Sequence, residues 1–386
     1  MEIDGNAFGK LVKSFREQRG WSQGELAERW GHTREYVSLI ERGKRKLSKQ
    51  EQVNRLADLL EIPTEQLDAV GKGIPQRHVH AEKPADADDI LLQTLLEPSL
   101  ATVKLSWFLW LADGENISIS DNLANLIERL DEALTKHHGQ FLKPAQKVLA
   151  CAHEMQGKIA FDQLRYTDAV GHFQEMLDLG TELHDANILA LAQIHRADVL
   201  RKRGRYEASV RILNSIPPIE DLASRYIEGV RWQILARTHS GFGYEDAFLD
   251  AIDHAEEIAT NTKETIDTQY NQFNLVEVLQ EKAQGYTMLW QPEKALNIYP
   301  RTDQLKPFRP LRELGSYTII KAQAHTYSGD VEKGIGLAIR GIELAHSYGS
   351  QRHISRVQVM YERLQLTRLQ KHPRVKDLKE ALRSVQ

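Results

Sequence analysis

The chain has 386 residues, of which 41% are hydrophobic and 27% are charged, and its formal net charge at pH 7 is −4. These values exclude both a single small domain and a disordered chain, and they predict two or three globular domains. The only cysteine, Cys151, excludes an internal disulfide framework and a multi-cysteine metal site, and it is typical of a reducing cytoplasm.

Nothing in the chain predicts a membrane segment. No basic-then-apolar leader opens the sequence. The most apolar run, VKLSWFLWLA at residues 103–112, has about half the length that a membrane span needs. We therefore expect a cytoplasmic protein with no membrane partner.

Positive charge is concentrated near the N-terminus. Residues 29–49 contain seven lysines and arginines but only two glutamates, Glu35 and Glu41. A local patch of this kind attracts a polyanion even when the whole chain is acidic.

Residues 6–70 show the caps and apolar periodicity of four or five short helices. Ser22 and Glu25 form a capping box at the start of one helix. Thr33 is the expected N-cap of the next, which runs to Arg42 and ends at Gly43. Two helices joined by a short turn in a small all-α domain predict a helix-turn-helix.

The residues FREQRGWSQGELAERWGHTREYVSLIERGKRKLSKQEQVNRLADLLEIP resemble the Xre/Cro-like helix-turn-helix family. The resemblance covers roughly residues 8–67, within a DNA-binding domain that we place at residues 1–67. It implies that Glu41 pairs with Arg16 in a structural role. It also implies that Gln23 contacts a phosphate or the first base pair of double-stranded operator DNA.

Position on the third helix assigns the other expected DNA contacts. Val37 and Ile40 are expected in the core, so the opposite face would enter the major groove. An arginine there can bind guanine in a bidentate pair, and a glutamate can accept from cytosine. The cations that follow the helix are expected to contact phosphates. Besides Gln23, the expected DNA-binding residues are Thr33, Arg34, Glu35, Ser38, Arg42, Lys44, Arg45 and Lys46.

Residues 68–90 lose the helical period and gather glycine, proline and charge, which predicts a linker. From residue 91 to residue 386 the sequence shows helical patterns only, so the predicted fold class is all-α. A small residue just after a turn, followed by an amphipathic helix, recurs five times. The small residues are expected at Ala169, Ala208, Ala247, Ala295 and Gly334.

These units resemble tetratricopeptide repeats that are longer than the usual 34 residues. The resemblance implies a right-handed α-solenoid whose concave face is lined by the first helix of each pair. Polar residues expected on that face would suit an extended peptide, whose backbone needs donors and acceptors. The expected ligand-binding residues are Lys158, Asn187, Gln193, Arg201, His239, Asn271, Asn274, Gln280, Gln284 and Gln323.

The order of the two domains resembles the RRNPP group of peptide-sensing bacterial regulators. The resemblance implies a transcriptional regulator that binds operator DNA as a homodimer through its repeats, and a short signalling peptide that changes the spacing of the paired DNA-reading helices. Asparagines hold the peptide backbone in that group, hence the inclusion of Asn187, Asn271 and Asn274.

Two alternatives stay open at this level: a repeat protein that binds or sequesters a partner protein, and a dimeric regulator without a ligand. An enzyme is not expected. The sequence contains no GxxxxGK[ST], GxSxG or HExxH motif, and no GxGxxG motif that opens a βαβ unit. We expect no cofactor and no metal site.

Overall fold

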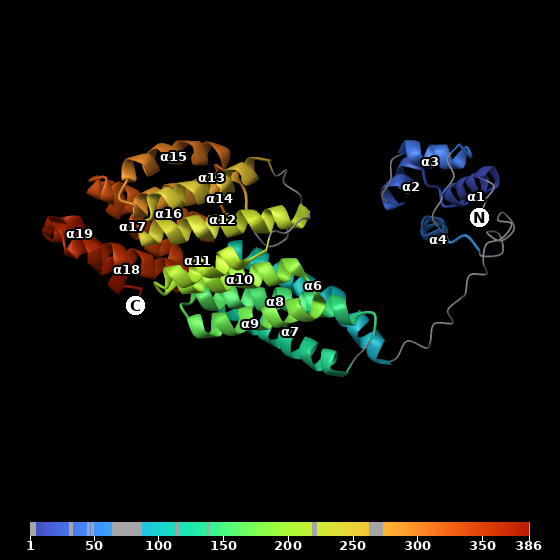
Figure 1. Ribbon diagram of the computed structural model, residues 1–386, viewed down its shortest axis with the longest axis horizontal. Helices are drawn as coiled ribbons and strands as arrows, with labels where there is room; N and C mark the ends of the chain where they lie inside the picture. The colour runs from blue at the N-terminus through green and yellow to red at the C-terminus, as the bar shows by residue number, and fades with distance from the viewer. Residues whose placement is uncertain are drawn as a thin grey trace. The chain divides into compact units, whose positions relative to one another are not determined.

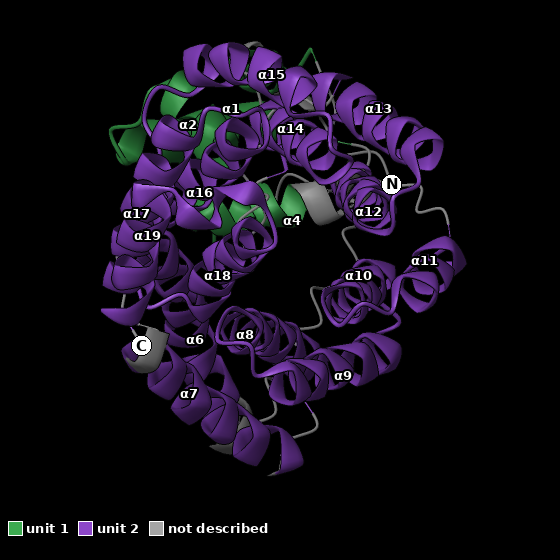
Figure 2. Ribbon diagram, turned by 90° about the vertical axis from the view of Figure 1, so that its left-hand side faces the viewer, with its two compact units in different colours: residues 1–86 green, residues 87–386 purple. Residues whose placement is uncertain are grey.

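The computed structural model describes residues 5–30, 34–44, 47, 50–63, 87–112, 116–136, 139–217, 222–261 and 273–385. Within these ranges every regular element is a helix, so the predicted all-α class is confirmed. The chain divides into two compact units, residues 1–86 and residues 87–386 (Figures 1 and 2). Each is described by itself.

Unit 1 contains four described helices: α1 (Gly5–Gln18), α2 (Gln23–Trp30), α3 (Arg34–Glu41) and α4 (Gln50–Leu59). Each contributes apolar residues at three- and four-residue steps to one core, which includes Val12, Leu26, Val37 and Leu56. Val37 and Ile40 of α3 are both 1% exposed. The predicted core face of α3 is therefore confirmed.

Local chemistry places the helix ends of unit 1. The Glu25 carboxylate accepts a hydrogen bond from the Ser22 backbone N–H at 2.6 Å, and the Ser22 hydroxyl accepts one from the Glu25 N–H at 3.2 Å. This is the predicted capping box. Gly43 has φ +67°, a left-handed conformation that favours glycine, and it follows the end of α3 as predicted.

A buried ion pair holds the helices of unit 1 together. The Arg16 guanidinium on α1 donates from Nε to Glu41 Oε1 at 2.6 Å and from Nη2 to Glu41 Oε2 at 3.1 Å. A third bond runs from Nη1 to the carbonyl of Trp21 at 2.6 Å, before α2. The side chains of Arg16 and Glu41 are 8% and 2% exposed. The pair therefore fixes the end of α3 against α1, as the family resemblance implies.

Unit 2 is a solenoid of antiparallel helix pairs. Its helices are α6 (Ala87–Ala112), α7 (Asn116–Lys136), α8 (Leu142–Asp162), α9 (Tyr166–Leu183), α10 (Ala186–Lys202), α11 (Tyr206–Ser215), α12 (Leu222–Phe242), α13 (Glu245–Asn261), α14 (Leu275–Met288), α15 (Pro292–Leu305), α16 (Leu311–Tyr327), α17 (Val331–Ser347), α18 (Gln351–Gln365), the short 3₁₀ helix η1 (Arg368–Lys371) and α19 (Pro373–Arg383). Helix α6 begins within the segment that the sequence predicts as a linker.

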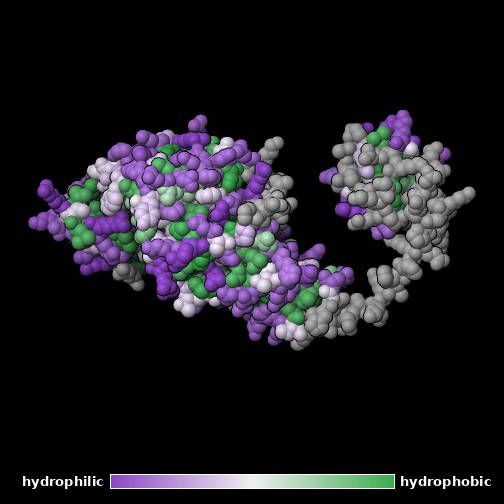
Figure 3. Space-filling view, in the orientation of Figure 1, coloured by the Kyte–Doolittle hydropathy of each residue, from purple (hydrophilic) through white to green (hydrophobic). Residues whose placement is uncertain are grey.

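Figure 2 shows the helices of unit 2 in two shells around its centre. The first helix of each pair, from α8 to α18 in even numbers, lies on the inside, and the second lies outside. The face of this unit drawn in Figure 3 is largely hydrophilic, with smaller hydrophobic patches between. Among the described helices, none has the length and apolar character required to span a membrane.

The predicted position of the small residue is wrong in two of the five helix pairs of unit 2 for which the sequence predicts one. The buried position is the fourth residue of each outer helix, which is Ala169 in α9, Ala295 in α15 and Gly334 in α17, as predicted. In α11 it is Ser209 instead of Ala208, and in α13 it is Phe248 instead of Ala247. Because the sequence pattern selects the alanine in each helix, the predicted buried position lies one residue too early. One residue corresponds to a rotation of about 100° around the helix axis.

Glycines on the inner helices accommodate aromatic rings. A Cβ atom at Gly285 of α14 would collide with the ring of Phe248, the large residue at the corrected position. In the same way, a Cβ at Gly157 would collide with Phe173, and one at Gly315 would collide with Tyr348. Each ring thus packs against a backbone where only glycine leaves enough space.

The solenoid closes on itself. Helix α16 packs against α6, and α18 packs against α8. At this junction Arg312 of α16 donates from Nη1 to Asp162 of α8 at 2.6 Å, from Nε to the Trp110 carbonyl at 2.7 Å, and from Nη2 to the Tyr348 carbonyl at 3.0 Å. The side chains of Arg312 and Asp162 are 4% and 1% exposed. The predicted solenoid therefore closes into a ring.

We predict that Glu41→Ala destabilises unit 1 by about 3–5 kcal/mol, because the Arg16 guanidinium would stay buried without its carboxylate. Thermal unfolding of the full chain, followed by circular dichroism, measures the change. The double variant Arg16→Met with Glu41→Leu serves as the control, since it removes both charges together and should recover most of the loss. A single variant as stable as the native chain would contradict the structural role of the pair.

Candidate functional site

The outward face of α3 carries the side chains expected to contact DNA. Arg34, the first residue of this helix, is exposed, and Ser38 is half-buried one turn later. The buried Val37 and Ile40 fix the rotation of the helix, so this face points away from the core. Thr33 and the side chain of Glu35 lie outside the described residues.

Cations follow α3 directly. Arg42 and Lys44 are exposed on either side of the left-handed Gly43. The Arg42 guanidinium donates from Nε to the Ser38 carbonyl at 3.1 Å, which holds its positive charge at the C-terminal end of α3, the end that favours cations. Arg45 and Lys46 lie outside the described residues.

Gln23, the first residue of α2, joins this helix to α3. Its side-chain amide donates to Glu41 Oε2 at 2.7 Å, so the buried Arg16–Glu41 pair also orients Gln23 at the start of α2. The sequence predicts a DNA contact for Gln23 but misses this bond, because residues 23 and 41 share no local pattern. Two helices are thus fixed in one orientation by a single carboxylate.

Comparison with known families agrees with this geometry, since the family model described as helix-turn-helix domain matches residues 7–70. Residues 7–70 form a helix-turn-helix domain. The chain is therefore a DNA-binding regulator of transcription, and its partner is DNA. A search of curated proteins finds no match to the chain.

Beyond the helix-turn-helix domain, unit 2 contains a cavity of about 220 Å³. Helices α8, α10, α12, α14 and α18 contribute most of its walls. The lining combines aromatic and charged side chains: Trp110, Lys158, Phe161, Asp162, Phe173, Ile194, His195, Asp198, Tyr226, Val230, Gln233, Ile234, Arg237, Phe273, Glu277 and Arg352.

Of the predicted ligand-binding residues, Lys158 lines this cavity. Arg201 lies nearby on α10, and its Nε donates to the cavity residue Asp198 at 2.7 Å. The side chain of Asn274 instead caps α14, where its oxygen accepts from the Glu277 N–H at 3.1 Å. A cap satisfies a helix terminus, so this asparagine stabilises the fold.

The other predicted residues are spread along the inner helices. Asn187 and Gln193 are half-buried on α10, and His239 is half-buried on α12. Gln280, Gln284 and Gln323 belong to α14 and α16, where Gln280 and Gln323 are 6% and 7% exposed. None of these six lines the cavity. Asn271 lies outside the described residues.

Sequence reasoning missed the ion pairs beside the cavity. Arg237 of α12 donates from Nε to Glu281 of α14 at 2.9 Å, and its Nη1 lies 3.8 Å from Asp198 of α10. Arg352 of α18 donates from Nε to Asp162 at 3.1 Å. These partners are up to 190 residues apart in the chain. The sequence contains only a local signal for these ion pairs, which is that Asp198 and Arg201 stand three residues apart and so share one face of a helix.

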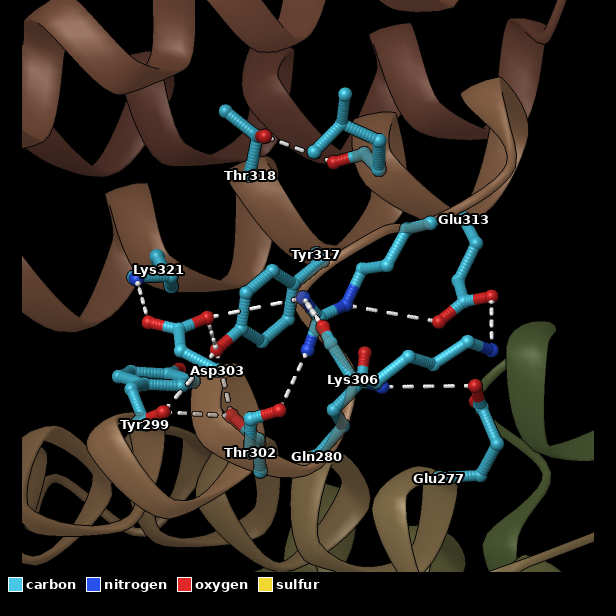
Figure 4. A network of polar contacts seen from close by, with 12 residues as sticks. Glu277, Gln280, Tyr299, Thr302, Asp303, Lys306, Glu313, Tyr317, Thr318 and Lys321 are labelled. Carbon is cyan, nitrogen blue, oxygen red and sulfur yellow. Dashed lines mark hydrogen bonds and ion pairs between the residues drawn. The ribbon is translucent and has the colours of Figure 1, made fainter.

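A second polar network lies between α14, α15 and α16 (Figure 4). Lys306 donates to Glu313 at 2.6 Å, and Gln280 donates to Glu277 at 3.5 Å. Burial, followed by the negative charge of Glu313, raises the pKa of Glu277 to about 8. Because Glu277 also lines the cavity, one wall carries a carboxyl group that is protonated at neutral pH.

We predict that Glu277→Gln stabilises the chain at pH 8 but not at pH 4.5. The folded pKa of Glu277 lies above its unfolded value, so the unfolded state releases this proton first and stability falls as the pH rises from about 4.5 to 8. The glutamine variant has no such proton to lose. Midpoints of thermal unfolding at the two pH values measure the difference, with the exposed Glu293→Gln as matched control. A gain of equal size at both pH values would contradict the assignment.

Proposed function

We propose that the chain is a cytoplasmic one-component regulator, not an enzyme: its helix-turn-helix domain binds operator DNA specifically, and its repeat domain senses a short peptide. The observation that carries the proposal is the combination of a helix-turn-helix domain with a ring of helix pairs around a cavity of mixed aromatic and charged lining. A ligand site of this composition gives both apolar contact and polar orientation.

In the proposed DNA complex, α3 enters the major groove and Arg34 binds the O6 and N7 atoms of a guanine. Glu35 accepts from a cytosine, and Ser38 faces the same bases. Gln23 and Thr33 lie at the edge of this contact. Cations that follow α3 in the sequence bind phosphates and supply affinity without sequence preference; these are Arg42, Lys44, Arg45 and Lys46.

The proposed regulator acts as a homodimer through the repeat domain. Helix α6 is apolar nearly all round, yet it exposes Leu105 by 56%, Phe108 by 67% and Leu109 by 40%. Helices of this kind are normally buried. Residues 98–112 contain one charge, Lys104, so two copies can pair there with little repulsion. A dimer presents two reading helices to two half-sites of an operator.

The proposed ligand is a short peptide, in line with the resemblance to the RRNPP group and to tetratricopeptide repeats. The cavity of about 220 Å³ is smaller than typical small-molecule pockets of about 300–1,000 Å³, so it receives one end of the peptide. The dimer would have two arrangements that differ in the spacing of its two α3 helices. Peptide binding changes this spacing only if the peptide has different affinities for the two arrangements.

We predict that Arg34→Ala removes the preference for one base at one base pair of each half-site. Lys44→Ala should instead weaken binding to all DNA sequences equally, and should reduce the slope of log affinity against log salt concentration by about one unit. Selection of binding sites from random duplex DNA by the full chain measures both effects. Two half-sites related by symmetry are expected from the native chain. An unchanged preference after Arg34→Ala would contradict base reading by this residue, and a single half-site would contradict the dimer.

We further predict that a peptide encoded beside the gene alters operator binding. Synthetic peptides derived from a small neighbouring open reading frame with a secretion signal are titrated into the protein–operator complex, and the operator affinity is measured. A change of tenfold or more is expected from one peptide, which corresponds to about 1.4 kcal/mol of coupling. Scrambled peptides are the control. An operator affinity that no peptide changes would contradict peptide sensing and leave DNA binding intact.

A further inference from the structure

Five cations from three helices meet beside the cavity. Arg201 and Lys202 end α10, Arg237 belongs to α12, and Arg352 and Arg356 stand four residues apart on one face of α18. Arg201 and Arg237 share the carboxylate of Asp198, at 2.7 Å and 3.8 Å. Arg237 and Arg352 line the cavity itself. The cluster is therefore continuous with the cavity wall.

The carboxylates around this cluster do not balance its charge. Asp162 pairs with Arg352, Asp198 with Arg201 and Arg237, and Glu281 with Arg237. Three carboxylates thus face five cations. Within this cluster, Lys202 and Arg356 form no ion pair with any described residue.

Arg356 is the most informative member of the cluster. Its Nη1 atom is buried, and no hydrogen-bond acceptor is present for it among the described residues. A buried charged donor without a partner costs free energy, so such groups are rare unless a bound molecule completes them. The position of Lys202 at the end of α10 fits the helix dipole, but Arg356 stands inside α18 and has no such explanation.

Electrostatics within the cluster agree with this excess of charge. Burial, and then the positive charges of Arg356 and Arg201, lowers the pKa of Lys202 to about 7. Burial, and then the charge of Arg352, lowers the pKa of Arg356 to about 9. Asp198 acts on Lys202 and Glu281 acts on Arg356 in the opposite direction, but burial and the neighbouring positive charges outweigh both carboxylates.

We propose that Arg201, Lys202, Arg237, Arg352 and Arg356 form an oxyanion site that binds a carboxylate or phosphate group of the ligand, whose apolar part enters the adjacent cavity. Guanidinium groups bind both oxyanions through paired hydrogen bonds. The aromatic walls formed by Trp110, Phe161 and Tyr226 suit an organic body attached to that anion. This inference rests on the proposed ligand sensing and deepens it, because a peptide would place its terminal carboxylate here.

The decisive experiment compares the native full chain with Arg356→Met, which keeps an unbranched apolar side chain and removes the charged guanidinium. Without added anion, the variant should unfold at the same or a higher temperature than the native chain, because an unpaired buried charge is lost. A merely structural arginine predicts the opposite, and a lower midpoint would overturn the proposal. The exposed Arg203→Met, at the end of α10, is the control.

Anion binding is then measured by calorimetric titration at constant ionic strength. The probes are inorganic phosphate, N-acetyl-L-phenylalanine and N-acetyl-L-phenylalanine amide, which lacks the carboxylate. Native protein and Arg203→Met should bind at least one of the two anions, and Arg356→Met should bind it roughly tenfold or more weakly. Preference for the free acid over its amide identifies a carboxylate ligand, and binding of phosphate alone identifies a phosphate-bearing one. No binding of either anion, or equal binding by Arg356→Met, would overturn the site.

Operator affinity separates this inference from the proposed function. If anions bind through Arg356 but no ligand changes operator affinity, the oxyanion site stands and sensing is contradicted. If a neighbouring-gene peptide changes operator affinity equally in the native chain and in Arg356→Met, sensing stands and the oxyanion site is contradicted.

Discussion

The buried pair of Asp162 and Arg312 joins the first half of unit 2 to its last helices. Arg312 uses all three of its guanidinium nitrogens in this junction and reaches helices α6, α8 and the turn before α18. Asp162 also accepts from Ser350 and Arg352. With so many bonds to one carboxylate, burial of the charge is compensated, and the helix pairs form a ring around the cavity.

The same carboxylate connects that junction to the proposed ligand site. Arg352 lines the cavity and binds Asp162, so a group that attracts Arg352 competes with the closure of the ring. In the proposed mechanism, a bound oxyanion draws Arg352 from Asp162, weakens this junction and thereby changes the curvature of unit 2. The coupling needs no long chain of intermediates, because both functions meet at one side chain.

Much of the fold was predictable because its signals are local. The capping box at Ser22, the stop at Gly43 and the apolar steps of α3 all lie within a few residues, and each is confirmed. Helix pairing in unit 2 followed from periodicity. Periodicity did not predict the buried position of α11 and α13 correctly, because Ser209 and Phe248 stand one residue from the alanines that the pattern selects.

The candidate sites divide in the same way. The Arg16–Glu41 pair was predictable through resemblance to a family, since single-sequence patterns do not join residues 25 apart. Of the predicted ligand-binding residues, Lys158 reaches the cavity wall. Among the others that the structure describes, Arg201 binds the cavity residue Asp198, Asn274 caps α14, and the rest lie elsewhere on the inner helices. Ring closure through Asp162 and Arg312, 150 residues apart, decides which side chains converge.

Closure has a consequence for how such a protein can evolve. An open solenoid can gain or lose a unit at either end, since each unit contacts only its neighbours. Here, α16 and α18 must reach α6 and α8 after a set number of turns, as the last strand of a barrel must reach the first. Duplication or deletion of one helix pair would separate Asp162 from Arg312, so closure of the ring limits how many helix pairs this solenoid can hold.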